Sequence, residues 1–389
     1  MKKKADLIVF GGGIGALSFL YELALLELVP ENLKKLKEIK ILLIHAPLLA
    51  TPCSFHTTST VSLTGIQPGV SPLGDLLFKS FHHFEHRFTP LIQSIPVSEL
   101  GIELVTKEYF FRNEEEKKDS PILVGSDAND GNERFKNLHE VYQNYIKDPY
   151  KKDFKTINEE NSYVIYPEIF QRFLLQSAMK KLTIEVVEDF ITKVECLDGD
   201  FLLKSQCGEY SAPKLLDARG AYQNEFQSFF PQHFGDSFVK DYNLTTVRGS
   251  FLRAKGPFLS AGFEKSFYRV FNDLNFIYRH HTQELIIGST TLRGAIVFEE
   301  RSLLKIYYDE IVKLVDLEIP RFEQFEVVTG LRTKAKKRTP LLKHYSNFQN
   351  LKTELWHFSG LYKNAYTTSF FLAFEELKTE VKQEILVTR

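Results

Sequence analysis

The feature that most constrains the fold is a glycine-rich turn near the start of the chain. Residues 5–10 form a short apolar run of strand length, and residues 17–26 have the length and composition of a helix. The segment between them, Gly11-Gly12-Gly13-Ile14-Gly15-Ala16, has the pattern G-x-G-x-x-A. This order predicts a strand, a tight turn and a helix that bind the phosphates of a dinucleotide. An ordinary βα unit with a glycine-rich turn is the alternative interpretation.

Each position of the motif has a physical role in such a site. Gly11 permits the tight turn, and Gly13 lets a phosphate approach the backbone closely. Ala16 is small enough for the helix to pack on the strand. The helix start, at Ile14 and Gly15, offers free N–H groups and the positive end of the helix dipole to a pyrophosphate. We therefore expect these five residues to bind the cofactor.

Composition restricts the class of protein. The 389 residues are enough for two or three domains. Lysine and arginine number 49 against 50 aspartate and glutamate residues, and the resulting net charge of -1 gives no reason to expect a nucleic acid or an anionic membrane as partner. The three cysteines lack metal-ligand spacing and fit a reducing compartment. His82, His83 and His86 also form no metal set, because adjacent residues point to different faces of a helix, so no metal is expected.

The N-terminus resembles a targeting signal only in part. Lys2-Lys3-Lys4 precedes apolar residues, as in a signal peptide. However, three glycines interrupt the apolar run, Glu22 and Glu27 fall in its later part, and no small-x-small cleavage site closes it. No run of about 18 or more apolar residues occurs elsewhere. We expect a cytoplasmic protein without a membrane span.

Two further features are candidate cofactor contacts. Residues 39–44 form a second buried strand, and His45 follows where an acidic residue usually accepts hydrogen bonds from ribose hydroxyls. A histidine can still bond one hydroxyl; alternatively, His45 is a loop residue. Thr58 and Ser59 lie in the hydroxyl-rich loop 51–60, whose hydroxyls can bond a second phosphate or, alternatively, their own backbone.

Hydrophobic periodicity predicts the remaining elements. Helices are expected over residues 72–88, 133–146, 167–178, 300–315 and 365–384. Strands are expected over residues 184–187, 191–195, 201–204 and 214–217. Four β-rich runs close together, at 245–253, 266–270, 275–279 and 284–288, predict an antiparallel sheet and hence a second domain.

Seven segments, taken in order, resemble the motifs of one known family. They are the turn 11–16, Tyr163–Pro167 ("G-Y-V-D-P"), Ile191, Asp217–Ala221 ("A-A-G-A"), Val247–Ser250 ("V-R-G-Q"), Gly330–Arg332 ("G-L-R-P") and Gly360–Ala365 ("G-H-x-R-N-G"). No single segment identifies a family. The order and spacing of all seven, over nearly the whole chain, resemble those of the D-amino-acid oxidase / glycine oxidase family of FAD-dependent amine oxidoreductases.

The resemblance implies a fold and a domain division. The fold class is α/β, with a Rossmann-like FAD-binding domain and a second α+β substrate domain built on an antiparallel sheet. We place the discontinuous FAD-binding domain at residues 1–92, 160–225 and 326–389. The substrate or cap domain then comprises residues 93–159 and 226–325.

The resemblance also assigns residues around the cofactor, which would be FAD. The backbone of Ile191 would meet the adenine, and Gly220 would lie in a turn beside the cofactor. Gly360, Lys363 and Asn364 form a strand-to-helix junction. Like the first turn, it would offer the free N–H groups of a helix start to an anionic group. Lys363 stands where the family has a second arginine near the substrate and flavin.

Arg332 is the expected substrate-binding residue. In the family, the arginine of "G-L-R-P" pairs with the substrate carboxylate, and a guanidinium can hold a carboxylate with two parallel hydrogen bonds. A structural or surface arginine is the alternative. Three departures bear on activity: His45 replaces the ribose acid, Thr333 replaces the proline after Arg332, and the family's substrate tyrosine falls at Phe276 or Asn275.

The resulting hypothesis is an FAD-dependent oxidation of the C–N bond of a small-molecule substrate, an amino acid or related amine. The changed substrate tyrosine and ribose acid leave open a flavin-binding protein without turnover that assists a partner. The basic run Lys334-Ala335-Lys336-Lys337-Arg338 is a solvated loop, or it attracts an anionic substrate such as a modified RNA base.

Overall fold

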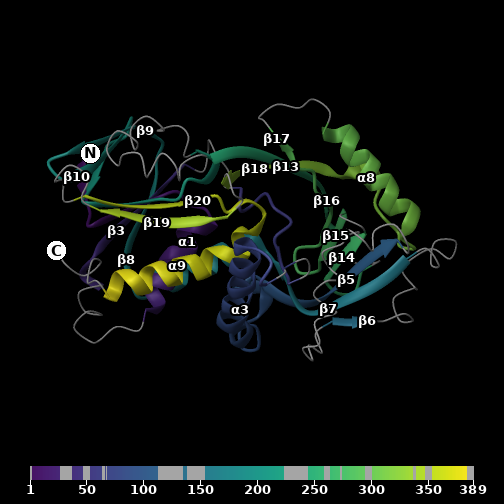
Figure 1. Ribbon diagram of the computed structural model, residues 1–389. Coiled ribbons are helices and arrows are strands. Elements are labelled where there is room, and N and C mark those ends of the chain that lie inside the picture. Colours follow the sequence, from purple (N-terminus) through teal and green to yellow (C-terminus); the bar gives the residue numbers. More distant parts are fainter. Residues whose placement is uncertain are drawn as a thin grey trace. The chain divides into compact units, whose positions relative to one another are not determined.

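The computed structural model divides the chain into two compact units (Figure 1). It describes residues 2–26, 37–46, 53–63, 66, 68–112, 135–137, 154–222, 244–257, 263–271, 274–293, 300–335, 339–346 and 353–382. Unit 1 comprises Met1–Phe55, Gln171–Val247 and Leu331–Arg389, and unit 2 comprises His56–Phe170 and Arg248–Gly330.

Unit 1 is built on a mainly parallel sheet with the strand order β19-β20-β12-β2-β3-β8. The strands are β19 (Leu341–Ser346), β20 (Glu354–Ser359), β12 (Lys214–Asp217), β2 (Leu7–Phe10), β3 (Lys40–His45) and β8 (Thr183–Glu188). β2 is buried along its whole length, as expected for a strand covered on both faces. Only the edge strand β19 runs antiparallel to its neighbour, so the carboxyl ends of the other five strands meet at one edge.

Helices and a smaller sheet cover the parallel sheet of unit 1. Helices α1 (Ile14–Leu25) and α9 (Ala365–Lys382) lie side by side (Figure 1), and the rings of Tyr21 and Phe370 meet edge to face at 6.2 Å. The smaller sheet has the strands β1 (Lys2–Lys4), β11 (Glu209–Ala212), β10 (Asp200–Ser205) and β9 (Ile191–Leu197). Side chains from both sheets, including Ile8 and Phe201, form one buried cluster. Helix α6 (Pro167–Met179) begins in unit 2 and continues into unit 1.

Unit 2 is built on a ten-stranded sheet. Its strands are β17 (Leu292–Arg293), β13 (Leu244–Lys255), β16 (Glu284–Gly288), β15 (Leu274–Arg279), β14 (Phe267–Phe271), β5 (Ile102–Arg112), β7 (Phe154–Ile165) and β4 (Thr60–Val61), with β18 (Glu326–Ala335) beside β13 and β6 (Phe135–Asn137) beside β7. The run from β13 through β16 and β15 to β14 is antiparallel, which confirms the predicted sheet.

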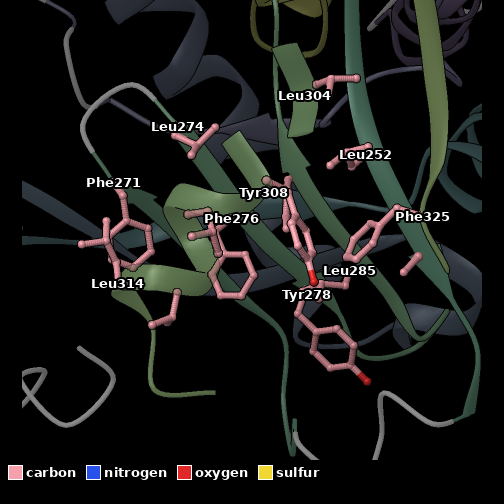
Figure 2. Close-up of a cluster of buried hydrophobic side chains, with 14 of the residues drawn as sticks. Leu252, Phe271, Leu274, Phe276, Tyr278, Leu285, Leu304, Tyr308, Leu314 and Phe325 are labelled. Carbon is pink, nitrogen blue, oxygen red and sulfur yellow. The ribbon is translucent and has the colours of Figure 1, made fainter. Parts of the chain in front are cut away.

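Helix α8 (Glu300–Leu314) packs on one face of this sheet. Figure 2 shows Leu304 and Tyr308 of the helix against Leu252, Phe276 and Leu285 of the strands. The other helices of unit 2 are α3 (Pro72–Ile92), α4 (Val97–Leu100) and the short 3-10 helix η4 (Phe322–Gln324).

The structure corrects one expectation of the sequence analysis. Within the predicted helix 133–146, the described residues Phe135–Asn137 form strand β6, because they pair with Glu159–Ile157 of β7; the rest of that segment lies outside the described residues. Arg332, the expected substrate-binding residue, lies inside β18, which continues to Ala335.

The units also differ from the expected domain boundaries. Residues 56–92 and 160–170 belong to unit 2, although the sequence analysis placed them in the first domain. The reason is packing, because the rings of Phe84 and Phe88 of α3 meet that of Phe170 edge to face, with ring centroids 6.4 and 5.2 Å apart. In the described part of the chain, no helix is long and apolar enough to cross a bilayer.

Candidate dinucleotide-binding site

The glycine turn lies at the carboxyl edge of the parallel sheet in unit 1. Gly11 has φ +118°, and a Cβ added to it would lie 2.6 Å from the carbonyl oxygen of Ala218. The Gly11 amide also donates to the carbonyl of Ile44 at 2.9 Å. The turn is therefore held between the ends of β12 and β3, in a space and a conformation that only glycine tolerates.

Helix α1 begins without a side-chain cap or an acidic residue in its first turn. The first intrahelical hydrogen bond runs from the Leu17 amide to the carbonyl of Gly13, so the amides of Ile14, Gly15 and Ala16 precede it. The Ser54 hydroxyl accepts from the Ile14 amide at a long 3.3 Å. The positive end of the helix is thus not neutralised by a carboxylate of its own first turn, as a phosphate site requires. Gly13 is itself partly exposed.

A buried hydrogen-bond network supports this helix start. The hydroxyl of Tyr366 donates to the Ser54 carbonyl at 2.7 Å and accepts from the amide group of Gln171 at 2.8 Å. The Ser54 hydroxyl donates to Oε1 of Gln171 at 3.3 Å. The network joins the loop after β3 to α6 and α9. No motif in the sequence predicts this network, and the hydroxyl-rich loop that contains Ser54 is the one local pattern that indicates part of it.

His45 lies at the end of β3, directly beside the turn. A Cβ on Gly12 would lie 3.0 Å from the His45 Cβ and 3.1 Å from its Cγ. Burial lowers the pKa of His45, and the nearby Glu188 carboxylate partly opposes this effect. The ring is therefore neutral at pH 7, and one nitrogen can donate while the other accepts.

The end of the neighbouring strand β12 carries a buried ion pair. Both oxygens of Asp217 accept from the Arg219 guanidinium at 2.9 Å, and this guanidinium lies 4.5 Å from the centre of the Phe10 ring. Gly220 follows with φ +61° and nothing within 4 Å of an added Cβ. Ile191, the expected adenine contact, is the buried first residue of β9.

A second glycine turn, between β20 and α9, lies at the same edge of the sheet. Gly360 has φ +70°, and its amide donates to the hydroxyl of Thr333 at 3.3 Å. The residue that replaces the family's proline therefore helps to hold this turn. The ammonium groups of Lys334 and Lys363 lie 5.7 and 5.8 Å from the centre of the Tyr362 ring.

The remaining residues of this turn form the start of helix α9. Lys363 has an exposed side chain. The backbone amide of Asn364 donates to the Leu361 carbonyl at 3.0 Å, and the Asn364 backbone carbonyl accepts from the Thr368 hydroxyl at 2.9 Å. Lys363 and the helix start therefore place positive charge beside the Gly360 turn.

Arg332 is buried in β18, and its described polar partner is the half-buried thiol of Cys53. Burial raises the pKa of Cys53, although the Arg332 charge acts in the opposite direction, so the thiol is neutral at pH 7. Among the described residues, no carboxylate forms an ion pair with Arg332. A buried guanidinium of this kind is suited to an anionic ligand.

Thr58 and Ser59 belong to unit 2, where their loop is bound to its own surroundings. The Thr58 carbonyl accepts from Arg279 at 2.9 Å, and the Ser59 hydroxyl donates to the Thr57 carbonyl at 3.2 Å. Ser59 is buried, with φ +48°. In this structure the Ser59 hydroxyl thus bonds its own loop, the alternative raised by the sequence.

The position expected for a substrate tyrosine supplies no phenol. Phe276 is fully buried and points into the core beneath α8 (Figure 2), whereas Asn275 is half-buried. In the described part of the chain, no three His, Cys, Asp or Glu side chains gather in a way that could hold a metal ion.

Comparison with known proteins identifies the fold. The sequence matches no protein-family profile and no curated protein. The structure is similar to glycine oxidase from Geobacillus kaustophilus, with a TM-score of 0.70 and 14% identity over 98% of this chain and 95% of that one. It is similar to L-alpha-glycerophosphate oxidase from Mycoplasma pneumoniae with FAD bound, with a TM-score of 0.70 and 15% identity over 100% and 96% of the two chains.

A third similar structure is L-proline dehydrogenase from P. horikoshii, with a TM-score of 0.67 and 10% identity over 98% of this chain and 95% of that one. These likenesses cover both units and nearly the full length of each chain. The chain therefore has the fold of these oxidoreductases, as the order of its sequence motifs predicted.

Proposed function

We propose that this chain is an FAD-dependent oxidoreductase that oxidises the C–N bond of an amino acid or related amine. The observation that carries the proposal is the glycine turn before α1, which is held at the sheet edge and lacks an acidic residue. The shared fold supports it, because one of the similar structures contains FAD. The substrate class comes from the resemblance of the sequence motifs and from Arg332.

The residues of unit 1 fit an FAD molecule. The turn 11–16 offers backbone amides to the diphosphate, and an added Cβ on Gly11 would collide with backbone. His45 ends β3 of the parallel sheet and would meet the ribose, and Ile191 begins β9 of the smaller sheet and would meet the adenine. The turn 360–364 supplies a second helix start for the flavin ring. Thr58 and Ser59 of unit 2 remain predicted phosphate contacts.

The chain's own contribution to the reaction is binding and electrostatics. When bound, FAD supplies the hydride acceptor. Arg332 would hold the substrate carboxylate with two hydrogen bonds, because its described partner is a neutral thiol. Lys363 and the start of α9 would stabilise negative charge near the Gly360 turn. No side chain of the described residues is assigned as a general base.

A flavin-binding protein without turnover is the second candidate, because Phe276 lies in the core and provides no phenol for a substrate. The test is the visible spectrum of the purified protein, followed by anaerobic addition of amino acids, imino acids and secondary amines. The proposal expects flavin absorption that at least one compound bleaches. Colour that no compound bleaches favours the second candidate, and colourless protein that takes up no FAD contradicts both.

The same panel addresses an anionic or RNA substrate. Lys336, Lys337 and Arg338 lie outside the described residues, so this possibility remains a prediction of the sequence. Bleaching by a modified nucleoside, with RNA binding that weakens steeply as salt rises, would support it.

A further inference from the structure

Strand β8, which lies beside β3, ends in a carboxylate next to His45, the residue that stands where a ribose-binding acid is expected. In the parallel pair of β3 and β8, His45 is in register with Glu188, the last residue of β8. Residues in register on parallel strands point to the same face of the sheet. Both therefore lie at the carboxyl edge, one and two strands away from the glycine turn at the end of β2.

His45 is fixed between the turn and Glu188. Its Cβ and Cγ lie within 3.1 Å of a Cβ built on Gly12, and its carbonyl accepts from the Asp189 amide at 2.9 Å. His45 and Glu188 are neighbours because they are paired in register across the two strands, and the Glu188 charge raises the pKa of His45 against the larger effect of burial. The pair thus combines a carboxylate with an imidazole that can both donate and accept.

Glu188 is the carboxylate that remains available at this edge. Within the described residues, the other carboxylates there are Asp189 and Asp217. Asp189 accepts from the hydroxyls of Ser205 and Tyr210, each at 2.5 Å, and Asp217 holds the Arg219 guanidinium. Glu188 is exposed and forms no ion pair with any described residue.

We propose that Glu188 and His45 together bind the hydroxyls of the adenosine ribose of FAD. In this chain the carboxylate lies at the end of β8, whereas dinucleotide-binding folds usually carry it at the end of the strand that corresponds to β3. Glu188 accepts hydrogen bonds from the ribose hydroxyls, and His45 bonds one of them from the side of the turn. This inference rests on the proposed function.

The test is a set of binding titrations with three variants and two nucleotides. Glu188→Gln removes the charge at the site, and Glu185→Gln is the matched control on the same strand, where Glu185 pairs with Lys3 and Lys40. Each apoprotein is titrated with FAD and with an FAD analogue whose adenosine carries 2′,3′-dideoxyribose. The dissociation constants are measured by quenching of flavin fluorescence.

We expect Glu188→Gln to bind FAD about 10- to 100-fold more weakly than the wild type, because a charged hydrogen bond is lost. It should bind the dideoxy analogue as the wild type does, and Glu185→Gln should behave as the wild type with both nucleotides. In the Glu188→Gln background, His45→Asp should restore part of the affinity for FAD, since it returns a carboxylate to the end of β3.

Two results would overturn the inference while FAD binding stands. Either Glu188→Gln binds FAD as tightly as the wild type does, or it loses the same affinity for FAD and for the dideoxy analogue. Failure of the proposed function is distinct, because the wild-type apoprotein would then bind neither nucleotide, and the inference would fall with it. Circular dichroism of each variant checks folding, which exposed Glu188 should not affect.

Discussion

Replacing Gly11 with alanine tests how tightly the first turn is packed. The residue has φ +118°, and the new Cβ would lie 2.6 Å from the Ala218 carbonyl oxygen and 2.8 Å from its carbonyl carbon. The left-handed backbone costs about 1–2 kcal/mol for a residue with a Cβ. Because both close atoms are backbone, the end of β12 or the start of α1 must move, which costs roughly a further 1–3 kcal/mol.

We therefore expect Gly11→Ala to lose about 2–5 kcal/mol of stability. In a domain of this size about 1 kcal/mol shifts Tm by roughly 2–4 °C, so differential scanning calorimetry should show a fall of about 4–20 °C. The loss of the turn geometry should also weaken FAD binding, measured by fluorescence quenching.

Gly15→Ala is the matched control for this experiment. Its new Cβ would meet Leu361 Cδ1, the movable end of a side chain, at 3.3 Å. Alanine is favoured over glycine in a helix by about 0.5–1 kcal/mol, so the net change should stay within about 1 kcal/mol. Equal changes of Tm in the two variants would refute the reasoning, because packing against Ala218 would then not distinguish Gly11.

Three further changes test other parts of the account. Tyr366→Phe removes the hydroxyl that joins two buried polar groups, and calorimetry should show a loss of about 1–3 kcal/mol. Arg332→Lys should raise KM for amino acids roughly 10- to 100-fold and leave amines without a carboxylate unchanged; equal losses would contradict a carboxylate-binding role. Burial opposes ionisation of Glu284, but Arg279 holds the pKa of Glu284 below its usual range. The ionised Glu284 therefore stabilises the fold above about pH 4.3, and this stabilisation is lost as the pH falls further. Glu284→Gln should lower the free energy of unfolding by about 1.5–3 kcal/mol at pH 7 and by less at pH 3.

The sequence predicted the parts of the site that local patterns encode. Gly11 and Gly360 each follow a short apolar strand, and His45 ends a third one. Because parallel strands bring their carboxyl ends to one edge, these distant residues meet once the strands are recognised. The antiparallel sheet of unit 2 was predicted for a similar reason, from four short β-rich runs close together in the chain.

Contacts between distant segments could not be predicted in this way. Ser54, Gln171 and Tyr366 meet across 117 to 312 positions of sequence, and no periodicity or motif connects them. Glu188 becomes the neighbour of His45 only because β8 pairs with β3, and that order cannot be read from either strand alone. The contact between Arg332 and Cys53 likewise joins distant segments and leaves no local pattern.

Helix propensity failed where a tertiary contact decided the structure. The segment 133–146 reads as a helix, yet residues 135–137 form an edge strand because their backbone pairs with β7. Backbone hydrogen bonds to a neighbouring strand can outweigh a weak local preference.

The most direct test of the central claim is the identity and amount of nucleotide held by the purified protein. The protein is denatured, the released compound is identified by chromatography and mass spectrometry, and the apoprotein is then titrated with FAD and with FMN. We expect release of FAD and saturable binding of FAD that is much stronger than binding of FMN, because the first turn would hold a diphosphate that FMN lacks. Colourless protein that binds no FAD, or binding of FMN as tight as that of FAD, would contradict it.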